Sequence, residues 1–265
     1  MSRRSVVPDF LAENEPGYRR YVVLGWLGEI LMTLGAVALL LCVYQLVWTN
    51  VAADRTATSV INDLVTEWEQ APPHPSAVPT QGGSPGSSGP TTATGAVGGA
   101  AVAFKPGQGF AILYVPRLGD SFRVPIVEGV ELGDLAKGVG HYPGTAMPGA
   151  VGNFSVAGHR ATHGQPFADM DRIRVGDQFI VQTQNSWYVY TTSETEIVLP
   201  TAVQVVLPVP NKPGVKPTQR LATFTTCNPR WASYQRLIVY TELTSTRTAT
   251  QGPPPQLPAA VVAGT

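Results

Sequence analysis

Cysteine is scarce in this chain, with only two among 265 residues. That number excludes a disulfide-dense scaffold and a four-cysteine zinc site. Charge is scarce as well, because charged residues make up 14% of the chain, against about 25% in an average soluble domain. The 18 basic and 18 acidic side chains cancel, so the basic surplus typical of nucleic-acid-binding proteins is missing and no nucleic-acid partner is expected.

What the chain does have is one long apolar run, residues 30–48 (ILMTLGAVALLLCVYQLVW), which the preceding VVLGWLGE extends. A run of about 20 apolar residues matches the ~30 Å hydrocarbon core of a bilayer. A cleaved signal peptide would have a shorter apolar region of about 7–15 residues. A buried helix of a soluble domain is the other alternative, but it is seldom apolar over such a length. We therefore predict a retained transmembrane signal anchor at 22–49.

The basic residues around this run predict its orientation. Arg19 and Arg20 lie just before it, whereas only Arg55 lies within twenty residues after it. Because cytoplasmic flanks carry the excess of Lys and Arg, residues 1–21 are predicted to be a cytoplasmic tail. The chain is then a single-pass protein of the cell membrane, with everything after the anchor on the extracellular side.

Two segments connect the anchor to the rest of the chain. Residues 50–71 are predicted to form a juxtamembrane amphipathic helix, because Val60, Leu64 and Trp68 follow one another at helical spacing. Residues 72–104 are rich in Pro, Gly, Ser and Thr and contain no formally charged residue. Such a composition cannot bury enough apolar surface to offset chain entropy, so this segment is predicted to be a disordered linker.

The remaining globular domain, residues 105–246, is predicted to be all-β, a barrel or a sandwich. Segments 131–138 and 166–173 have the pattern of short helices, and 247–265 that of a disordered C-terminal tail. Eight stretches rich in β-branched and aromatic residues, separated by turn formers, predict the strands: 110–118, 121–129, 153–159, 177–183, 187–198, 203–207, 220–227 and 234–243.

Cys227 is the first candidate for chemistry. Cys42 lies in the predicted membrane span and Cys227 in the external domain, so the two cannot pair. A lone thiol in an oxidising compartment calls for an explanation. It is either a buried cysteine that packs as a small hydrophobe or a nucleophile at the end of a strand. Arg236 starts the next predicted strand, so a short hairpin would return it beside Cys227.

A nucleophilic thiol needs a base or a positive neighbour, and the domain offers three histidines. His159 ends a predicted strand, which makes it the candidate partner of Cys227. His141 lies in a Gly/Pro-rich loop, where a surface histidine is expected. His163 also follows in a loop, so a zinc site of His159 and His163 lacks the helix and the glutamate that such sites use, and no metal site is predicted.

Three short motifs in this order resemble those of the sortase family. TFTTC at 223–227 resembles the T-L-x-T-C signature with phenylalanine in place of leucine, AGHR at 157–160 resembles the histidine motif, and RLIVY at 236–240 resembles the strand that carries the arginine. Each motif alone is weak, but three in order at suitable spacing are strong. The resemblance covers about residues 105–245 and implies a closed eight-stranded sortase-type β-barrel with short helices.

The resemblance also implies roles for these residues. Cys227 would be the nucleophile, His159 the general acid and base, and Arg236 the group that holds the substrate carbonyl and stabilises the oxyanion. The implied activity is a cysteine transpeptidase or endopeptidase that needs no cofactor. It would cleave secreted proteins at a C-terminal sorting signal, between Thr and Gly, and transfer them to an amine of a peptidoglycan precursor.

The phrases HYPGTAMPG and TTCNPRW, together with the linker composition, look most like class E housekeeping sortases of actinobacteria. That resemblance implies an L-A-x-T-G signal rather than L-P-x-T-G. The substrate groove is expected near residues 197–219. No acidic cluster suggests the calcium site of some class A members.

Other wall-acting cysteine enzymes fit the sequence less well. An L,D-transpeptidase would have a histidine beside its cysteine, and a papain-like hydrolase places cysteine before histidine, whereas here His159 precedes Cys227. The alternative of another class is a membrane-tethered, non-catalytic binding module in which Cys227 belongs to the core.

Overall fold

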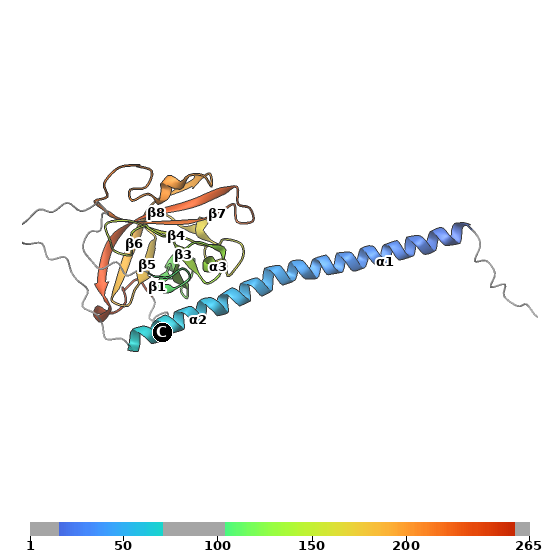
Figure 1. Ribbon diagram of the computed structural model, residues 1–265, viewed down its shortest axis with the longest axis horizontal. Helices are drawn as coiled ribbons and strands as arrows, with labels where there is room; N and C mark the ends of the chain where they lie inside the picture. Colours follow the sequence, from blue (N-terminus) through green and yellow to red (C-terminus); the bar gives the residue numbers. More distant parts are fainter. Residues whose placement is uncertain (1–15, 71–103, 258–265) are drawn as a thin grey trace, which may run out of the picture. The chain divides into compact units, whose positions relative to one another are not determined.

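The structure is a computed structural model that describes residues 16–70 and 104–257 (Figure 1). The chain divides into two compact units, Met1–Thr49 and Asn50–Thr265. The first part of the predicted cytoplasmic tail and the predicted linker up to residue 103 lie outside the described residues, as do residues 258–265.

The first unit holds the helix α1 (Pro16–Val43), followed by the π-helical turn η1 (Tyr44–Trp48). The segment Arg20–Val43 contains 24 residues and is long and apolar enough to cross a membrane. At about 1.5 Å per residue its length is about 36 Å, which exceeds the ~30 Å core of a bilayer. Its large apolar side chains are exposed on all sides. This helix therefore has the length and the surface that the predicted membrane anchor needs.

The second unit begins with the helix α2 (Thr49–Gln70). The helix lies beside the barrel (Figure 1). Ile61 and Leu64 of its apolar stripe are buried against the barrel's outer side. Their partners are side chains of three barrel strands and of the chain after the last strand: Ile112, Tyr114, Ile180, Trp187, Val189 and Leu257. The helix thus covers an apolar patch on the barrel wall.

This packing predicts a stability effect for Leu64→Ala. Removing a buried leucine side chain should lower the free energy of unfolding of the 50–265 fragment by about 2–4 kcal/mol, because the contacts with the barrel wall are lost. Chemical denaturation measures it, and Glu67→Ala on the exposed face of the same helix is the matched control. Equal unfolding free energies for the two variants would show that α2 does not stabilise the barrel.

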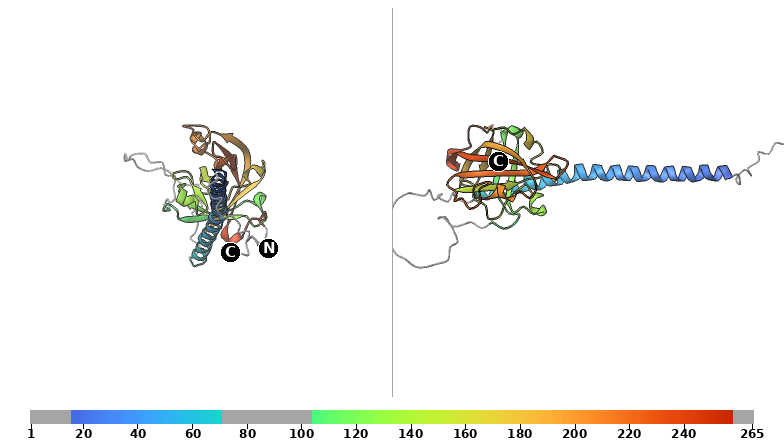
Figure 2. Two further views of the ribbon diagram at one scale, coloured as in Figure 1. Left: turned by 90° about the vertical axis from the view of Figure 1, so that its right-hand side faces the viewer. Right: turned by 90° about the horizontal axis from the view of Figure 1, so that it is seen from above.

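Eight strands close into a barrel in the order β1-β2-β3-β4-β7-β8-β6-β5, so the predicted closed eight-stranded, all-β fold is confirmed. Figure 2 shows the molecule from two further sides. The pairs β2–β3 and β4–β7 are parallel, and the other six are antiparallel. The strands are β1 (Gly109–Tyr114), β2 (Arg123–Glu128), β3 (Val139–His141), β4 (Gly152–Ala157), β5 (Gln178–Gln182), β6 (Ser186–Val198), β7 (Arg220–Asn228) and β8 (Gln235–Thr248).

Five short helical turns connect these strands or follow them. They are η2 (Pro116–Leu118), α3 (Leu132–Leu135), η3 (Met170–Arg172), η4 (Val203–Val206) and η5 (Ala249–Gln251). Only α3 is an α-helix, and the other four are 3₁₀ turns. The short helix predicted at 166–173 is therefore reduced to the turn η3.

The interior of the barrel is filled by alternate side chains of each strand, as the pleat requires. Phe154 on β4 and Phe224 on β7 belong to this core. Phe179 on β5 stacks on Phe224 with 4.1 Å between ring centroids. Since every second residue is directed inward, the residues between them are directed outward, and this alternation decides which side chains reach the site.

The strand predicted at 203–207 is wrong, because Val203–Val206 form the 3₁₀ turn η4. Its β-branched side chains pack on the barrel, and the segment forms no β-ladder. Val205 is buried against Ile238 and Tyr240 on the outside of β8. Prolines bracket the segment at 200 and 208, and proline cannot donate a ladder hydrogen bond.

The strand that the sequence does not predict is β3, because its segment has the composition of a loop. Glycines are required there by close backbone contact, since a Cβ at Gly138 would meet the Pro125 carbonyl oxygen at 2.3 Å and one at Gly140 that of Gly129 at 2.2 Å. The expected surface position of His141 is also wrong, because this residue is 2% exposed. Its Nδ1 lies 2.6 Å from the Glu128 carboxylate.

Order also extends further toward the C-terminus than the composition predicts. A disordered tail is expected from residue 247, yet β8 runs to Thr248 and η5 follows it. Leu257 is then buried beside α2 and the barrel wall. The buried Leu257, together with hydrogen bonds from Arg247 to the carbonyl oxygens of Gln251 and Gly252, thus holds residues 249–257 against the domain.

Candidate active site

Three predicted site residues lie at the ends of three adjacent strands. Cys227 on β7 pairs in register with Arg236 on the antiparallel strand β8. On its other side β7 runs parallel to β4, with Ala157 opposite Thr225. Continuing this register by two residues places His159 level with Cys227, and the Gly158 N–H still donates to the Thr225 carbonyl oxygen at 3.1 Å. Residues far apart in sequence are thereby brought together.

Cys227 and Arg236 also belong to the outward-directed set of their strands. Ala222 and Phe224 of β7 face the core, so Thr223, Thr225 and Cys227 face outward. The same alternation, counted from Leu237 on β8, directs Arg236 outward. The thiol and the guanidinium therefore share one outer face of the barrel, and His159 follows two residues after the end of the adjacent strand β4. Cys227 is half-buried on that outer face.

His159 opens the histidine loop, which we define as residues 158–169. Gly158 is needed at its start, because a Cβ would meet the Phe167 ring at 2.5 Å. The Thr226 hydroxyl donates to the Gly158 carbonyl oxygen at 2.7 Å and joins the loop to β7. Near its other end, α2 approaches the loop, and the Gly164 N–H donates to Asn50 Oδ1 at 3.0 Å. The loop is thus fixed from two sides.

The imidazole of His159 has an unusual environment. Its Nε2 is buried and has no hydrogen-bond partner among residues 16–70 and 104–257. The ring stacks on His163, with 4.9 Å between centroids. Desolvation by burial, and secondly repulsion from His163, lower the pKa of His159 below its ordinary value. The neutral imidazole is therefore favoured.

This stacking predicts a pH effect for His163→Ala. Removing the second ring admits water to His159 and removes a like charge, so both changes raise the pKa of His159. Titration of the His159 ring protons by NMR, in the Cys227→Ala chain to avoid coupling with the thiol, measures the shift. The protonated form should persist to higher pH. An unchanged or lower pKa would contradict the role assigned to His163.

Arg236 is held by the loop between β7 and β8. Its Nη1 donates to the carbonyl oxygens of Ser233 at 2.8 Å and Gln235 at 2.9 Å. Within the described part of the chain its Nε and Nη2 have no hydrogen-bond partner. The guanidinium is thus fixed on one edge and open on the other, which suits a donor to a substrate carbonyl.

Two neighbours of these residues have no assigned role in the sequence analysis. The Tyr142 hydroxyl lies 3.0 Å from the Thr225 hydroxyl. Thr225 precedes Cys227 by two residues and is on the same face of β7. Arg160 follows His159 in the sequence but is only 5% exposed. The sequence gives no signal for either contact, because each depends on chain segments more than 60 residues away.

A cavity of about 420 Å³ adjoins the histidine loop. Its wall includes His163 and Gln165 of this loop, Asp54 and Thr58 of α2, and Phe122. Desolvation raises the pKa of Asp54 in this wall. Among the described residues, no group of three or more His, Cys, Asp or Glu side chains is arranged to hold a metal ion.

Known proteins resemble this chain in sequence and in structure. The sortase domain family matches residues 113–244. Sortase SrtE1 of Streptomyces coelicolor is 38% identical over 239 residues, 87% of this chain and 60% of SrtE1. Sortase SrtE2 of the same organism is 32% identical over 243 residues, 88% of this chain and 87% of SrtE2. The chain thus spans less than two thirds of the length of SrtE1.

Solved structures give the same result. Sortase E from Streptomyces avermitilis is 40% identical, with a TM-score of 0.54, and the match covers 58% of this chain and 100% of that one. Sortase E1 from Streptomyces coelicolor, solved with a tripeptide in its active site, is also 40% identical, with a TM-score of 0.53, 59% of this chain and 100% of that one covered.

The barrel and these relatives define the class of protein as a closed eight-stranded β-barrel of the sortase type. The chain belongs to the sortase family. Within the family it is similar to the sortase E proteins of Streptomyces, which confirms the resemblance to class E.

Proposed function

We propose that this chain is a membrane-anchored sortase that joins secreted proteins to the cell wall. It cleaves a C-terminal sorting signal between Thr and Gly and transfers the new carboxyl end to an amine of a peptidoglycan precursor. The observation that carries the proposal is the pairing of Cys227 on β7 with Arg236 on β8, while β4, which leads into His159, pairs with the other side of β7.

In the first step Cys227 acts as the nucleophile. Its thiolate sulfur attacks the carbonyl carbon of the threonine, and the Thr–Gly C–N bond breaks. The product is a thioester between Cys227 and the sorted protein. A half-buried position at the end of β7 leaves the sulfur accessible to a peptide that lies on the outer face of the barrel.

His159 moves the protons of both steps. The lowered pKa makes the imidazolium the minor form near neutral pH. This form donates a proton to the departing glycine amine, and the neutral base that results then takes one from the incoming amine. The second amine attacks the thioester carbonyl, the C–S bond breaks, and Cys227 returns as the thiolate. The buried Nε2 without a hydrogen-bond partner supports this role, because no other described group competes for it.

Arg236 stabilises the charge that develops on the threonine carbonyl oxygen. Its guanidinium stays charged at any working pH, and its Nε and Nη2 edge is free to donate hydrogen bonds to an oxyanion. The two carbonyl contacts of Nη1 hold that edge in place before the substrate arrives. Donors that are held in place in this way stabilise the negative charge as it develops on the oxygen in the transition state.

The substrate and the location follow from the family and from the N-terminal helix. The related sortase E1 was solved with a tripeptide in its active site, which fits peptide binding on this face of the barrel. We place the L-A-x-T-G or L-P-x-T-G signal against η4 and the segment 197–219, which covers the outside of β7 and β8. The apolar helix α1 anchors the enzyme in the cell membrane, with its N-terminus cytoplasmic and the barrel outside.

A pair of fluorogenic peptides tests the proposed specificity. The full chain in detergent micelles, given an excess of a small amine, should cleave a peptide with L-A-x-T-G faster than the same peptide with L-P-x-T-G. Product analysis by mass spectrometry should show the amine joined to the threonine. Equal rates would remove the argument for an L-A-x-T-G signal, and no cleavage of either peptide would contradict the proposed function.

A further inference from the structure

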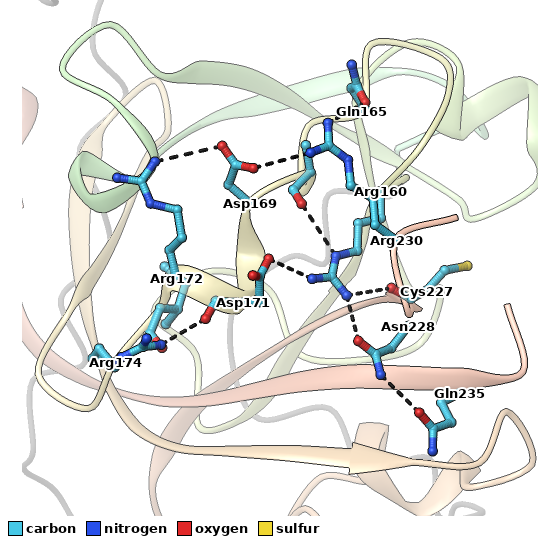
Figure 3. A network of polar contacts seen from close by, with 12 residues as sticks. Arg160, Gln165, Asp169, Asp171, Arg172, Arg174, Cys227, Asn228, Arg230 and Gln235 are labelled. Carbon is cyan, nitrogen blue, oxygen red and sulfur yellow. Dashed lines mark hydrogen bonds and ion pairs between the residues drawn. The ribbon is translucent and has the colours of Figure 1, made fainter. Parts of the chain in front are cut away.

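Arg160 is a buried charge in the wall of the candidate site. A buried guanidinium is costly unless its donors are paired. Three of its nitrogens have partners (Figure 3): Nη2 donates to Asp171 Oδ1 at 2.6 Å, Nη1 to Asn228 Oδ1 at 2.6 Å, and Nε to the Ala168 carbonyl oxygen at 3.4 Å. The same Nη1 also donates to the Cys227 carbonyl oxygen at 3.3 Å.

The chain of hydrogen bonds continues beyond Arg160. Asn228 uses its Nδ2 to donate to Gln235 Oε1 at 3.0 Å. Each of these three side chains is the direct sequence neighbour of one candidate site residue. Arg160 follows His159, Asn228 follows Cys227, and Gln235 precedes Arg236.

Strand geometry explains why this matters. Consecutive side chains of a strand point to opposite faces, so Asn228 on β7 and Gln235 on β8 lie behind Cys227 and Arg236 and not on the substrate face. Arg160, in the loop after β4, is buried and hydrogen-bonded to Asn228. Figure 3 shows the Cys227 sulfur directed away from the Arg160 guanidinium, which contacts only the carbonyl of that residue. The network therefore ties together the ends of β4, β7 and β8 and leaves the thiol free.

We propose that Arg160 is a positioning residue that, through Asn228 and Gln235, fixes Cys227, His159 and Arg236 relative to one another. This inference rests on the proposed function of those three. Charge-assisted hydrogen bonds are short and strong, and a planar guanidinium can satisfy several acceptors at fixed angles. Lysine has its three donors on one nitrogen, whereas Arg160 reaches Ala168, Asn228 and Asp171 from three separate nitrogens.

The outer end of the network anchors it to the histidine loop and to the turn η3. Asp171 is 64% exposed, yet it accepts the 2.6 Å hydrogen bond from Arg160. Partial burial acts to raise the pKa of Asp171, but the hydrogen bond from Arg160 and one from its own backbone outweigh it, so the pKa lies below its ordinary value. A second hydrogen bond also joins the histidine loop to the loop between β7 and β8: Arg230 Nη2 donates to Gln165 Oε1 at 2.9 Å.

The test compares Arg160→Lys and Asn228→Ala with Arg172→Lys, a surface substitution of the same type. All three are made in the full chain with Cys42→Ala, so that a thiol reagent counts active sites at Cys227. We expect kcat per reactive thiol on the L-A-x-T-G peptide to fall about 10- to 100-fold in Arg160→Lys and Asn228→Ala, because small displacements of reacting groups have effects of this size. KM should change less than about threefold, since the network lies behind the substrate face.

Coupling between the two residues gives a second readout. If Arg160 acts through Asn228, the loss in the double variant should be clearly smaller than the product of the single losses. Asn228→Ala removes a half-buried side chain and keeps the test decisive even if Arg160→Lys does not fold. Unchanged kcat in Asn228→Ala, with Cys227→Ala inactive, would overturn the positioning role and leave the proposed function standing. Activity in Cys227→Ala would instead overturn the proposed function.

Discussion

Cys227→Ala should abolish cleavage of a sorting-signal peptide, lowering kcat/KM by at least about 10⁴-fold. The reason is that, among the described residues of the barrel, Cys227 carries the only thiol that can form a thioester with the substrate. The fold should be retained, because the side chain is half-buried and alanine is smaller. A continuous fluorogenic assay on the full chain in detergent micelles measures the loss.

Cys42→Ala is the matched control for this experiment. Cys42 is the other cysteine of the chain and is exposed on the apolar helix α1, outside the barrel. Its replacement should leave the rate unchanged. If Cys227→Ala keeps measurable activity while the Cys42 variant is normal, the thioester mechanism is wrong, and Cys227 is a packing residue of a binding module.

His159→Ala should have the second largest effect, a loss of about 10³-fold in kcat/KM, within the range of general acid–base catalysis. Without the imidazole the departing glycine amine has no proton donor, and the incoming amine has no base. The loss should appear mainly in kcat, because the ring exchanges protons in the transition state and does not hold the bound peptide. Steady-state kinetics near neutral pH measure it.

A control for this variant is His74→Ala, in the predicted linker. It should have the activity of the parent chain. A loss of less than about tenfold in His159→Ala would be smaller than general acid–base catalysis supplies, and it would require another proton carrier near Cys227.

The sequence predicts much of this architecture because its strands have strong local signals. Seven of the eight strands coincide with stretches rich in β-branched and aromatic residues, and the order of TFTTC, AGHR and RLIVY places the candidate residues at strand ends. The register then pairs Cys227 with Arg236, as the predicted hairpin between β7 and β8 implies. The strand that leads into His159 pairs with the other side of β7. Local pattern and pairing agree at these positions.

Other features depend on contacts that leave no local pattern. The strand β3 is built around glycines that permit close backbone approach, so it reads as a loop. The segment 203–206 has the composition of a strand but packs as η4 on the outside of the barrel. Likewise, nothing in the sequence shows that α2 covers the barrel wall, or that the buried guanidinium of Arg160 joins His159 to Cys227 through their neighbours.

The acyl-enzyme itself is the most direct test of the central claim. The full chain is mixed with a peptide carrying L-A-x-T-G in the absence of an added amine and quenched with acid, and its mass is measured before and after proteolytic digestion. We predict a mass increase equal to the peptide up to threonine, less one water, located on the fragment that contains Cys227 and absent from Cys227→Ala. Release of glycine-terminated product without this adduct, or an adduct on another residue, would contradict the account.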